Sequence, residues 1–112
     1  MRGDVGAGRP EPPGAPPQAA RGLTVKYFAT IRTYTGETGR RLDDAPADLR
    51  ALLATLAGRY GTPFRRAVFS DAELNDEIII LVNGRNVRYL QGLDTPLEVD
   101  DEVSIFPMVA GG

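Results

Sequence analysis

The 112-residue sequence contains no cysteine and no histidine. Without cysteine the chain has no disulfide framework, no thiolate metal ligands and no thiol nucleophile. Without histidine it lacks the usual general base near neutral pH and the commonest metal ligand. Its two serines, Ser70 and Ser104, have no histidine to activate them. No ordinary catalytic constellation survives, and we expect a protein that is not an enzyme and binds no metal.

Lysine is also scarce, because Lys26 is the only lysine among the 13 basic residues. Residues 22–112 carry ten basic and 13 acidic side chains, so the basic face that nucleic-acid binding needs is not evident. No stretch approaches the roughly 20 apolar residues of a membrane span, and no signal-peptide apolar run is present. We therefore expect a cytoplasmic protein with neither nucleic acid nor membrane as a partner.

Acidic residues cluster at positions 71–73, 76–77 and 100–102. Paired carboxylates can perform acid–base chemistry or bind a hard cation. The alternative is a solvated acidic loop or a protein-docking surface, which we prefer. No glycine-rich phosphate loop follows a strand, so we expect no nucleotide bound by this chain.

The first 21 residues differ from the rest, since they hold five of the nine prolines and a single large aliphatic residue, Val5. Such a segment cannot bury enough apolar surface to offset the entropy of ordering it. We predict a disordered arm at 1–21 and one folded domain at 22–112, which ends in a flexible tail at 107–112. A start codon assigned too early, or a ligand for aromatic-lined grooves, are the alternatives for the arm.

Hydrophobic periodicity predicts the elements of the domain. Residues 23–28 alternate as a half-buried strand, 29–39 suit a turn, and 40–42 form a return strand. A helix starts at residues 43–46 and ends at Gly61, and a short second helix spans 63–69. Residues 70–76 read as a loop. The first of the two helices has a stripe of residues expected to be buried, namely Leu49, Leu52, Leu53, Leu56 and Tyr60.

The second half of the chain reads as strands. The aliphatic run at 77–82 predicts a central strand buried on both faces. Asn83-Gly84 is a strong hairpin signal, after which 85–87 pair back briefly. Residues 89–101 read as a loop, and 102–106 form the last strand, which Pro107 closes. One helix covers only one face of such a sheet, so we predict an α+β fold with a four- to five-stranded mixed sheet wrapped around one main helix.

The last residues, Pro107-Met108-Val109-Ala110-Gly111-Gly112, run directly off this strand. Six residues reach ~20 Å when extended, and glycines lack the Cβ that would block a narrow channel. The terminal carboxyl is ionised at neutral pH. A carboxylate on such an arm can be delivered into the active site of another protein, whereas a frayed terminus is the alternative.

Three stretches carry a family resemblance. Residues 25–32 with Gly36 resemble the opening strand and turn of the MoaD/ThiS sulfur carriers, residues 81–87 resemble their central hairpin, and 100–107 with 109–112 resemble their last strand and tail. The chain looks most like the MoaD branch, and Met108 stands where many members have a second proline. The resemblance implies the ubiquitin-like β-grasp fold.

The resemblance also implies a function. An adenylating (E1-like) partner would use ATP to activate the carboxylate of Gly112, and a sulfurtransferase would supply sulfur to form a thiocarboxylate. The carrier itself would bind no cofactor. In MoaD relatives it docks on the large subunit of molybdopterin synthase and donates the sulfur to a pterin precursor during molybdenum cofactor biosynthesis.

Periodicity predicts the docking face. Lys26 and Phe28 lie opposite the core-facing residues of the first strand, and Phe106 lies opposite the core-facing residues of the last strand. These two strands are neighbours in a β-grasp fold, so Phe28 and Phe106 would share the uncovered face near the root of the tail. An exposed aromatic pair is typical of a partner site.

Three alternatives stay open. Residues 86–89 and the Val-Ala-Gly-Gly ending are similar to the carrier of an alternative cysteine-synthesis route. A protein modifier would be joined to lysines through Gly112. A plain interaction domain would use no tail chemistry at all.

Overall fold

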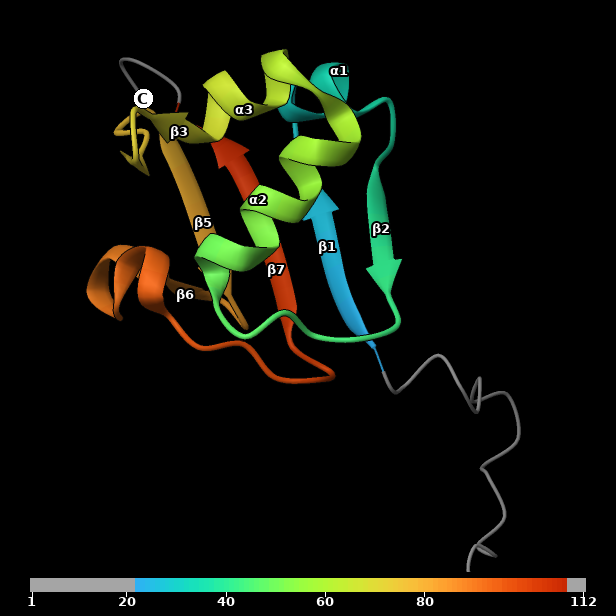
Figure 1. Cartoon of the computed structure of the whole chain (residues 1–112), viewed down its shortest axis with the longest axis vertical. Coiled ribbons are helices and arrows are strands. Elements are labelled where there is room, and N and C mark those ends of the chain that lie inside the picture. Colours follow the sequence, from blue (N-terminus) through green and yellow to red (C-terminus); the bar gives the residue numbers. More distant parts are fainter. Residues whose placement is uncertain (1–21, 109–112) are drawn as a thin grey trace, which may run out of the picture.

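The computed structural model describes residues 22–108, and residues 1–21 and 109–112 lie outside this description. The predicted disordered arm therefore stays a prediction. Figure 1 shows the main helix lying across one face of a sheet. The elements in chain order are β1 (Leu23–Tyr27), α1 (Thr30–Thr35), β2 (Gly39–Leu42), α2 (Leu49–Tyr60), α3 (Thr62–Val68), β3 (Phe69–Ser70), β4 (Glu73–Leu74), β5 (Ile78–Val82), β6 (Arg85–Asn86), the 3-10 turns η3 (Val87–Tyr89) and η4 (Gly92–Asp94), and β7 (Glu102–Pro107).

The main sheet has five strands in the order β2-β1-β7-β5-β6. β1 and β7 run parallel, while the other neighbouring pairs are antiparallel. The N-terminal hairpin, the main helix and the mixed sheet confirm the predicted α+β, β-grasp architecture. β7 lies in the middle of this order, so the strand that ends in the tail has a neighbour on each side.

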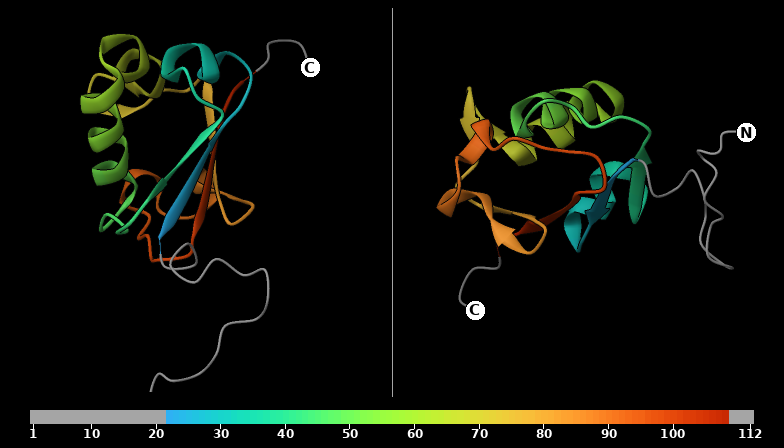
Figure 2. Two further views of the ribbon diagram at one scale, coloured as in Figure 1. Left: turned by 90° about the vertical axis from the view of Figure 1, so that its right-hand side faces the viewer. Right: turned by 90° about the horizontal axis from the view of Figure 1, so that it is seen from below.

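Residues 77–82 are predicted as a central strand buried on both faces; the strand does lie inside the sheet, between β7 and β6, but the predicted burial on both faces is wrong. β5 lies beside the edge strand β6, and its residues alternate, with Ile78, Ile80 and Val82 buried and the two between them only half-buried. The helices cover one face of the sheet, as the left view of Figure 2 shows. An all-aliphatic strand therefore points one row of side chains into the core and the other row onto the open face.

The turn predicted at 29–39 contains a helix. α1 spans six residues, buries Ile31, and ends at Gly36, whose φ of 74° is the left-handed conformation that glycine adopts at little cost. A sequence with three threonines and few apolar residues does not signal a helix by periodicity. Its two buried side chains, Ile31 and Thr35, and its C-terminal cap hold this short helix.

The main helix begins later than predicted. Asp48, rather than residues 43–46, is its N-cap, and the Asp48 carboxylate accepts a hydrogen bond of 2.9 Å from the Ala51 N–H. The preceding segment is held against residues 95–97, because the Leu49 N–H donates to the Thr95 carbonyl and the Leu97 N–H donates to the Ala47 carbonyl. This pairing keeps the chain before Asp48 out of the helix. The expected buried stripe is otherwise present, with Tyr60 half-buried at its end.

Shorter elements refine the remaining predictions. The helix predicted at 63–69 is α3, and the Asn83-Gly84 turn joins β5 to β6 with φ values of 52° and 85°. The predicted loop at 70–76 contains the small hairpin β3–β4, which turns at Asp71 with φ of 58°. The predicted loop at 89–101 contains η4, and η3 overlaps its start. In these segments local hydrogen bonds supply the order that periodicity does not reveal.

The core lies between the helices and the covered face of the sheet. Its largest fully buried side chains include Tyr27, Phe64 and nine leucines and isoleucines from β1, α1, α2, β5 and β7. Within residues 22–108 no helix is long and apolar enough to cross a membrane. Because one layer of helices covers one face, the opposite face of the sheet is left for contacts with solvent or a partner.

Candidate functional site

The described chain is anchored up to the point where the tail leaves. Pro107 still belongs to β7 and pairs with Ile78, and the Met108 N–H donates a 2.9 Å hydrogen bond to the Glu77 carbonyl. Met108 is about half exposed. The predicted reactive residue Gly112 and its neighbours Val109, Ala110 and Gly111 lie outside the described residues. Counted from Met108, these four residues span at most ~14 Å when extended.

Phe28 and Phe106 lie side by side on the open face, next to the root of the tail. Their rings stack with centroids 4.4 Å apart and planes inclined by 7°. Both are half-buried, so the alternation predicted for β1 and β7 is confirmed. The parallel pairing of β1 with β7 brings the two rings together from positions 78 residues apart in the chain. Each ring keeps part of its surface exposed, which is the arrangement of an aromatic pair that a partner could cover.

Two residues that the sequence analysis missed extend this surface. Ile79 pairs with Phe106 and Leu81 pairs with Ser104 across β5 and β7, and both are half-buried. We call Phe28, Phe106, Ile79 and Leu81 the open-face patch. Their positions alternate with the buried residues of β5, which is the pattern that could have identified them. Because every residue of this strand is aliphatic, the sequence did not reveal the alternation. The patch gives the uncovered face a contiguous apolar centre, which is the composition of a protein-docking site.

Lys26, the third predicted docking residue, lies on the same face, farther from the tail. Its Nζ lies 3.2 Å from Oε2 of Glu102, and both side chains are nearly half exposed. An exposed ion pair of this kind contributes at most about 1 kcal/mol. The pair is therefore free to rearrange when another charged group approaches.

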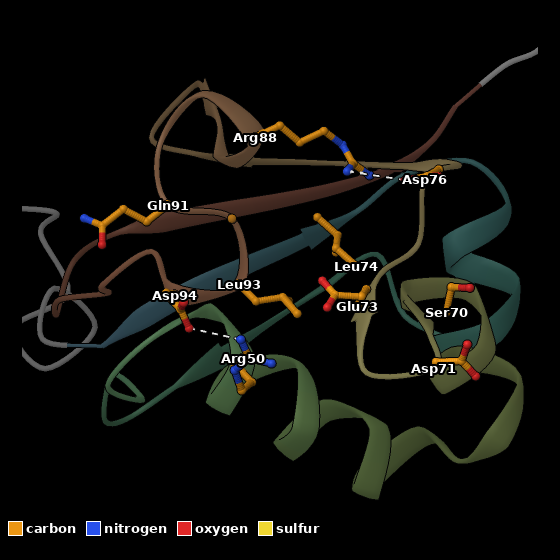
Figure 3. Close-up of a pocket in the computed structure, with 11 residues that line it drawn as sticks. Arg50, Ser70, Asp71, Glu73, Leu74, Asp76, Arg88, Gln91, Leu93 and Asp94 are labelled. Atoms are coloured by element: carbon orange, nitrogen blue, oxygen red, sulfur yellow. Dashed lines mark hydrogen bonds and ion pairs between the residues drawn. The ribbon is translucent and has the colours of Figure 1, made fainter.

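The acidic segments do not assemble a reactive site. Figure 3 shows the hollow that most of them line, between α2, β3–β4 and η4. Arg50 pairs with Asp94 at 3.0 Å, and Arg88 lies 3.9 Å from Asp76, so cations are interspersed among the carboxylates. Within residues 22–108 no group of three or more carboxylates is placed to hold a metal ion. The hollow fits the solvated surface that we preferred over acid–base chemistry.

A partly buried polar network stands apart from this surface. The hydroxyls of Tyr27 and Tyr60 are 2.9 Å apart, and the Tyr60 hydroxyl donates a 2.6 Å hydrogen bond to Glu37 Oε2. Burial raises the pKa of Tyr27, and the Tyr60 hydrogen bond together with Arg40 holds the pKa of the Glu37 carboxyl below its usual range. The network joins β1 and the loop before β2 to α2, so its role is to fix the scaffold.

Comparisons with known proteins show one matching family and several similar proteins. Residues 25–112 match the ThiS family. The chain is 37% identical over 92 residues to small archaeal modifier protein 3 of Haloferax volcanii, covering 80% of this chain and 98% of that protein. It is 33% identical over 93 residues to the sulfur carrier protein CysO of Mycobacterium tuberculosis, with the same coverages of 80% and 98%. The solution structure of small archaeal modifier protein 1 from Methanosarcina acetivorans superimposes with a TM-score of 0.70 at 32% identity, covering 82% of this chain and 97% of that chain.

Proposed function

Because the chain belongs to the ThiS family of small, ubiquitin-like, non-catalytic sulfur carriers, we propose that the carboxylate of Gly112 is its reactive group. The observation that carries this proposal is the family match, which runs through Gly112. It agrees with a sequence that has no cysteine or histidine to perform chemistry of its own. The partner enzymes supply the catalytic residues, and this chain supplies the acyl group.

The chemistry follows from the state of the carboxyl group. Near neutral pH it is an anion, because its ordinary pKa is about 3.5, and an anionic carboxylate is a poor electrophile. An adenylating partner transfers AMP from ATP to the Gly112 carboxylate and releases pyrophosphate. The outer sulfur of a persulfide on a sulfurtransferase then attacks the acyl carbon, and the bond to the AMP oxygen breaks. A thiol of the partner cleaves the S–S bond of the resulting acyl disulfide, which releases the thiocarboxylate and leaves a disulfide behind. The product is a C-terminal thiocarboxylate that can donate sulfur in the cytoplasm.

The open-face patch is the surface on which the partners dock in this proposal. Phe106 is adjacent to Pro107, so a partner that covers the patch already holds the root of the tail. The hydrogen bond between Met108 and Glu77 fixes where the tail leaves the fold. A partner active site therefore has to lie within ~14 Å of Met108, the extended length of the last four residues. Lys26 lies at the rim of the same contact.

The final acceptor that we propose is the pterin precursor of the molybdenum cofactor, on the large subunit of molybdopterin synthase. The family resemblance of residues 25–32, 81–87 and 100–112 supports this choice. A second candidate, a cysteine-synthesis route, is favoured by the 33% identity to a protein named CysO. A third, conjugation to lysines through Gly112, is favoured by the 37% identity to a protein named as a modifier.

The activation step is tested by intact-mass spectrometry of the full chain, incubated with ATP, an adenylating enzyme of this family and a sulfur source. We expect a mass gain that corresponds to one oxygen-to-sulfur exchange and that maps to Gly112. Omitting ATP, or deleting Gly112, is expected to abolish the gain. A chain that stays unmodified with its cognate adenylating enzyme would contradict the proposal.

The acceptor is tested separately with thiocarboxylated protein. It is offered in parallel to a molybdopterin synthase large subunit with its pterin precursor and to a cysteine synthase with an activated serine. If the carrier loses the mass of the added sulfur in only one of the two mixtures, that mixture identifies the pathway. A search for Gly-Gly remnants on lysines of cellular proteins tests the modifier function, and their absence would remove it.

A further inference from the structure

A second surface lies beside the open-face patch, along the outer edge of the sheet. It is a hollow of about 590 Å³ between β1, β2 and α1. Lys26, Arg32, Arg40 and Arg41 line it, and none of its lining residues is acidic. Arg40 pairs with Glu37 and Lys26 with Glu102, so Arg32 and Arg41 carry most of its uncompensated positive charge. We call this surface the β2 hollow.

Three of the four cations, Lys26, Arg32 and Arg41, follow the open-face residues 24, 26 and 28. Arg41 Nη1 donates to Thr24 Oγ1 at 3.1 Å, and the Arg32 guanidinium lies 5.6 Å from the centroid of the Phe28 ring. Lys26 lies between these two positions along β1. Thr24, Lys26 and Phe28 are two residues apart, so the backbone positions that these cations follow repeat at roughly 7 Å, and Lys26 has to exchange Glu102 for a new partner. Alternate side chains of any extended peptide repeat at the same distance.

The backbone of β2 offers the second half of a binding site. Among residues 22–108, β2 pairs only with β1 and is an edge of the sheet. The Tyr27 N–H donates to the Thr38 carbonyl at 3.0 Å, and hydrogen-bonded pairs alternate along an antiparallel ladder. The N–H and C=O groups of Gly39 and Arg41 therefore point outward from the sheet. An unpaired edge of this kind accepts an additional strand.

Gly39 keeps the floor of the hollow free of side chains. A Cβ at this position would lie 2.8 Å from the Val25 carbonyl oxygen, closer than real Cβ atoms approach. The close approach of β2 to β1 thus requires glycine here. It also leaves the backbone accessible between Lys26 and Arg41.

We propose that β2 binds an extended acidic segment of a partner protein, which adds to the sheet as a further strand. Its main chain bonds to the outward groups of Gly39 and Arg41, and carboxylates at alternate positions meet Arg32, Lys26 and Arg41. The positive charge selects against a second copy of this chain, because two β2 edges would bring like charges together. The proposal needs neither ATP nor a thiocarboxylate, so its failure leaves the proposed sulfur chemistry untouched.

The test is an NMR titration of the full ¹⁵N-labelled chain with a blocked peptide in which valine alternates with aspartate. We expect the largest amide shifts at Gly39 and Arg41. Replacing each aspartate by asparagine should weaken binding by about tenfold or more, because three partly exposed ion pairs are lost. A peptide N-methylated at alternate residues should lose the β2 shifts, because it cannot complete the ladder.

Matched variants complete the experiment. The double variant Arg41→Gln with Arg32→Gln should bind the acidic peptide about tenfold more weakly. The control variant Arg65→Gln, on α3 and so on the covered side of the sheet, should bind it with unchanged affinity. Equal binding of the acidic and neutral peptides would overturn the proposal. So would slow amide exchange at Gly39 and Arg41 in the free chain, because it would show that the chain itself already covers this edge.

Discussion

Replacing Phe106 by alanine separates the two roles of its ring, one within the free chain and one at the partner contact. In the free chain the ring stacks on Phe28 with centroids 4.4 Å apart and is half-buried. Aromatic pairs of this geometry contribute about 0.5–1.5 kcal/mol beyond the area they bury. We expect Phe106→Ala to lower the unfolding free energy by about 1–2 kcal/mol, well within what a small domain tolerates. A double-mutant cycle with Phe28→Ala isolates the stacking contribution.

In the proposed docking contact the partner would cover the part of the Phe106 ring that is exposed in the free chain. A central aromatic residue contributes about 2 kcal/mol or more to binding, so Phe106→Ala should weaken binding of the adenylating enzyme by about 30-fold. Calorimetric titration measures this, and urea unfolding of the same variant shows that the chain is still folded. Tyr89→Ala is the matched control, because Tyr89 is 87% exposed and lies outside the patch. Equal affinities of the parent chain and the Phe106 variant would refute the docking face.

Two further predictions test the scaffold. Asp48→Ala should lower the unfolding free energy by about 1 kcal/mol in urea titrations, because an N-cap hydrogen bond is lost. Asp43→Ala should change it by less than about 0.5 kcal/mol, because Asp43 precedes the helix. Tyr60→Phe should lower the free energy of unfolding by about 1–2 kcal/mol at pH 7, because the Tyr27 hydroxyl and the Glu37 carboxylate lose their shared hydrogen-bond partner. The folded state lowers the pKa of Glu37, so its stabilisation is present above the ordinary carboxyl pKa of about 4.3. The difference in unfolding free energy between the parent chain and the Tyr60→Phe variant should therefore become smaller as the pH falls below that value.

The sequence predicted the parts of this fold that repeat a period over several residues. The stripe of α2 and the alternation of β1 and β7 each follow one rule across a whole element, and both are confirmed. The alternation, together with the strand order implied by the β-grasp resemblance, correctly placed Phe28 and Phe106 on one face, and the parallel pairing of β1 with β7 brings them together. Where the period was hidden, the prediction failed. In β5 both faces carry aliphatic residues, so Ile79 and Leu81 gave no sign that they line the open face.

Element boundaries and short helices were the other failures, and both have a tertiary cause. Asp48 caps α2 because residues 47–49 pair with residues 95–97, a contact that a local reading of Pro46 cannot include. α1 is held by two buried side chains and a left-handed Gly36, which is too little to produce a periodic pattern. The basic lining of the β2 hollow has the same origin. Arg41 comes to the hollow through the pairing of β1 with β2, and Arg32 through α1, where its Nε donates a hydrogen bond to the Tyr27 carbonyl.

The arrangement explains how a chain without catalytic side chains can still control a reaction. The sheet places an apolar anchor, the Phe28–Phe106 stack, one residue before the end of β7. The Met108 N–H is hydrogen-bonded to the Glu77 carbonyl, so a partner docked at the anchor would find the origin of the tail at a fixed position. Orienting a reactive group in this way converts an encounter between two proteins into a nearly intramolecular step. In the proposed function, the scaffold's contribution to the chemistry is therefore position, and the anchor and the Met108 contact are the features that supply it.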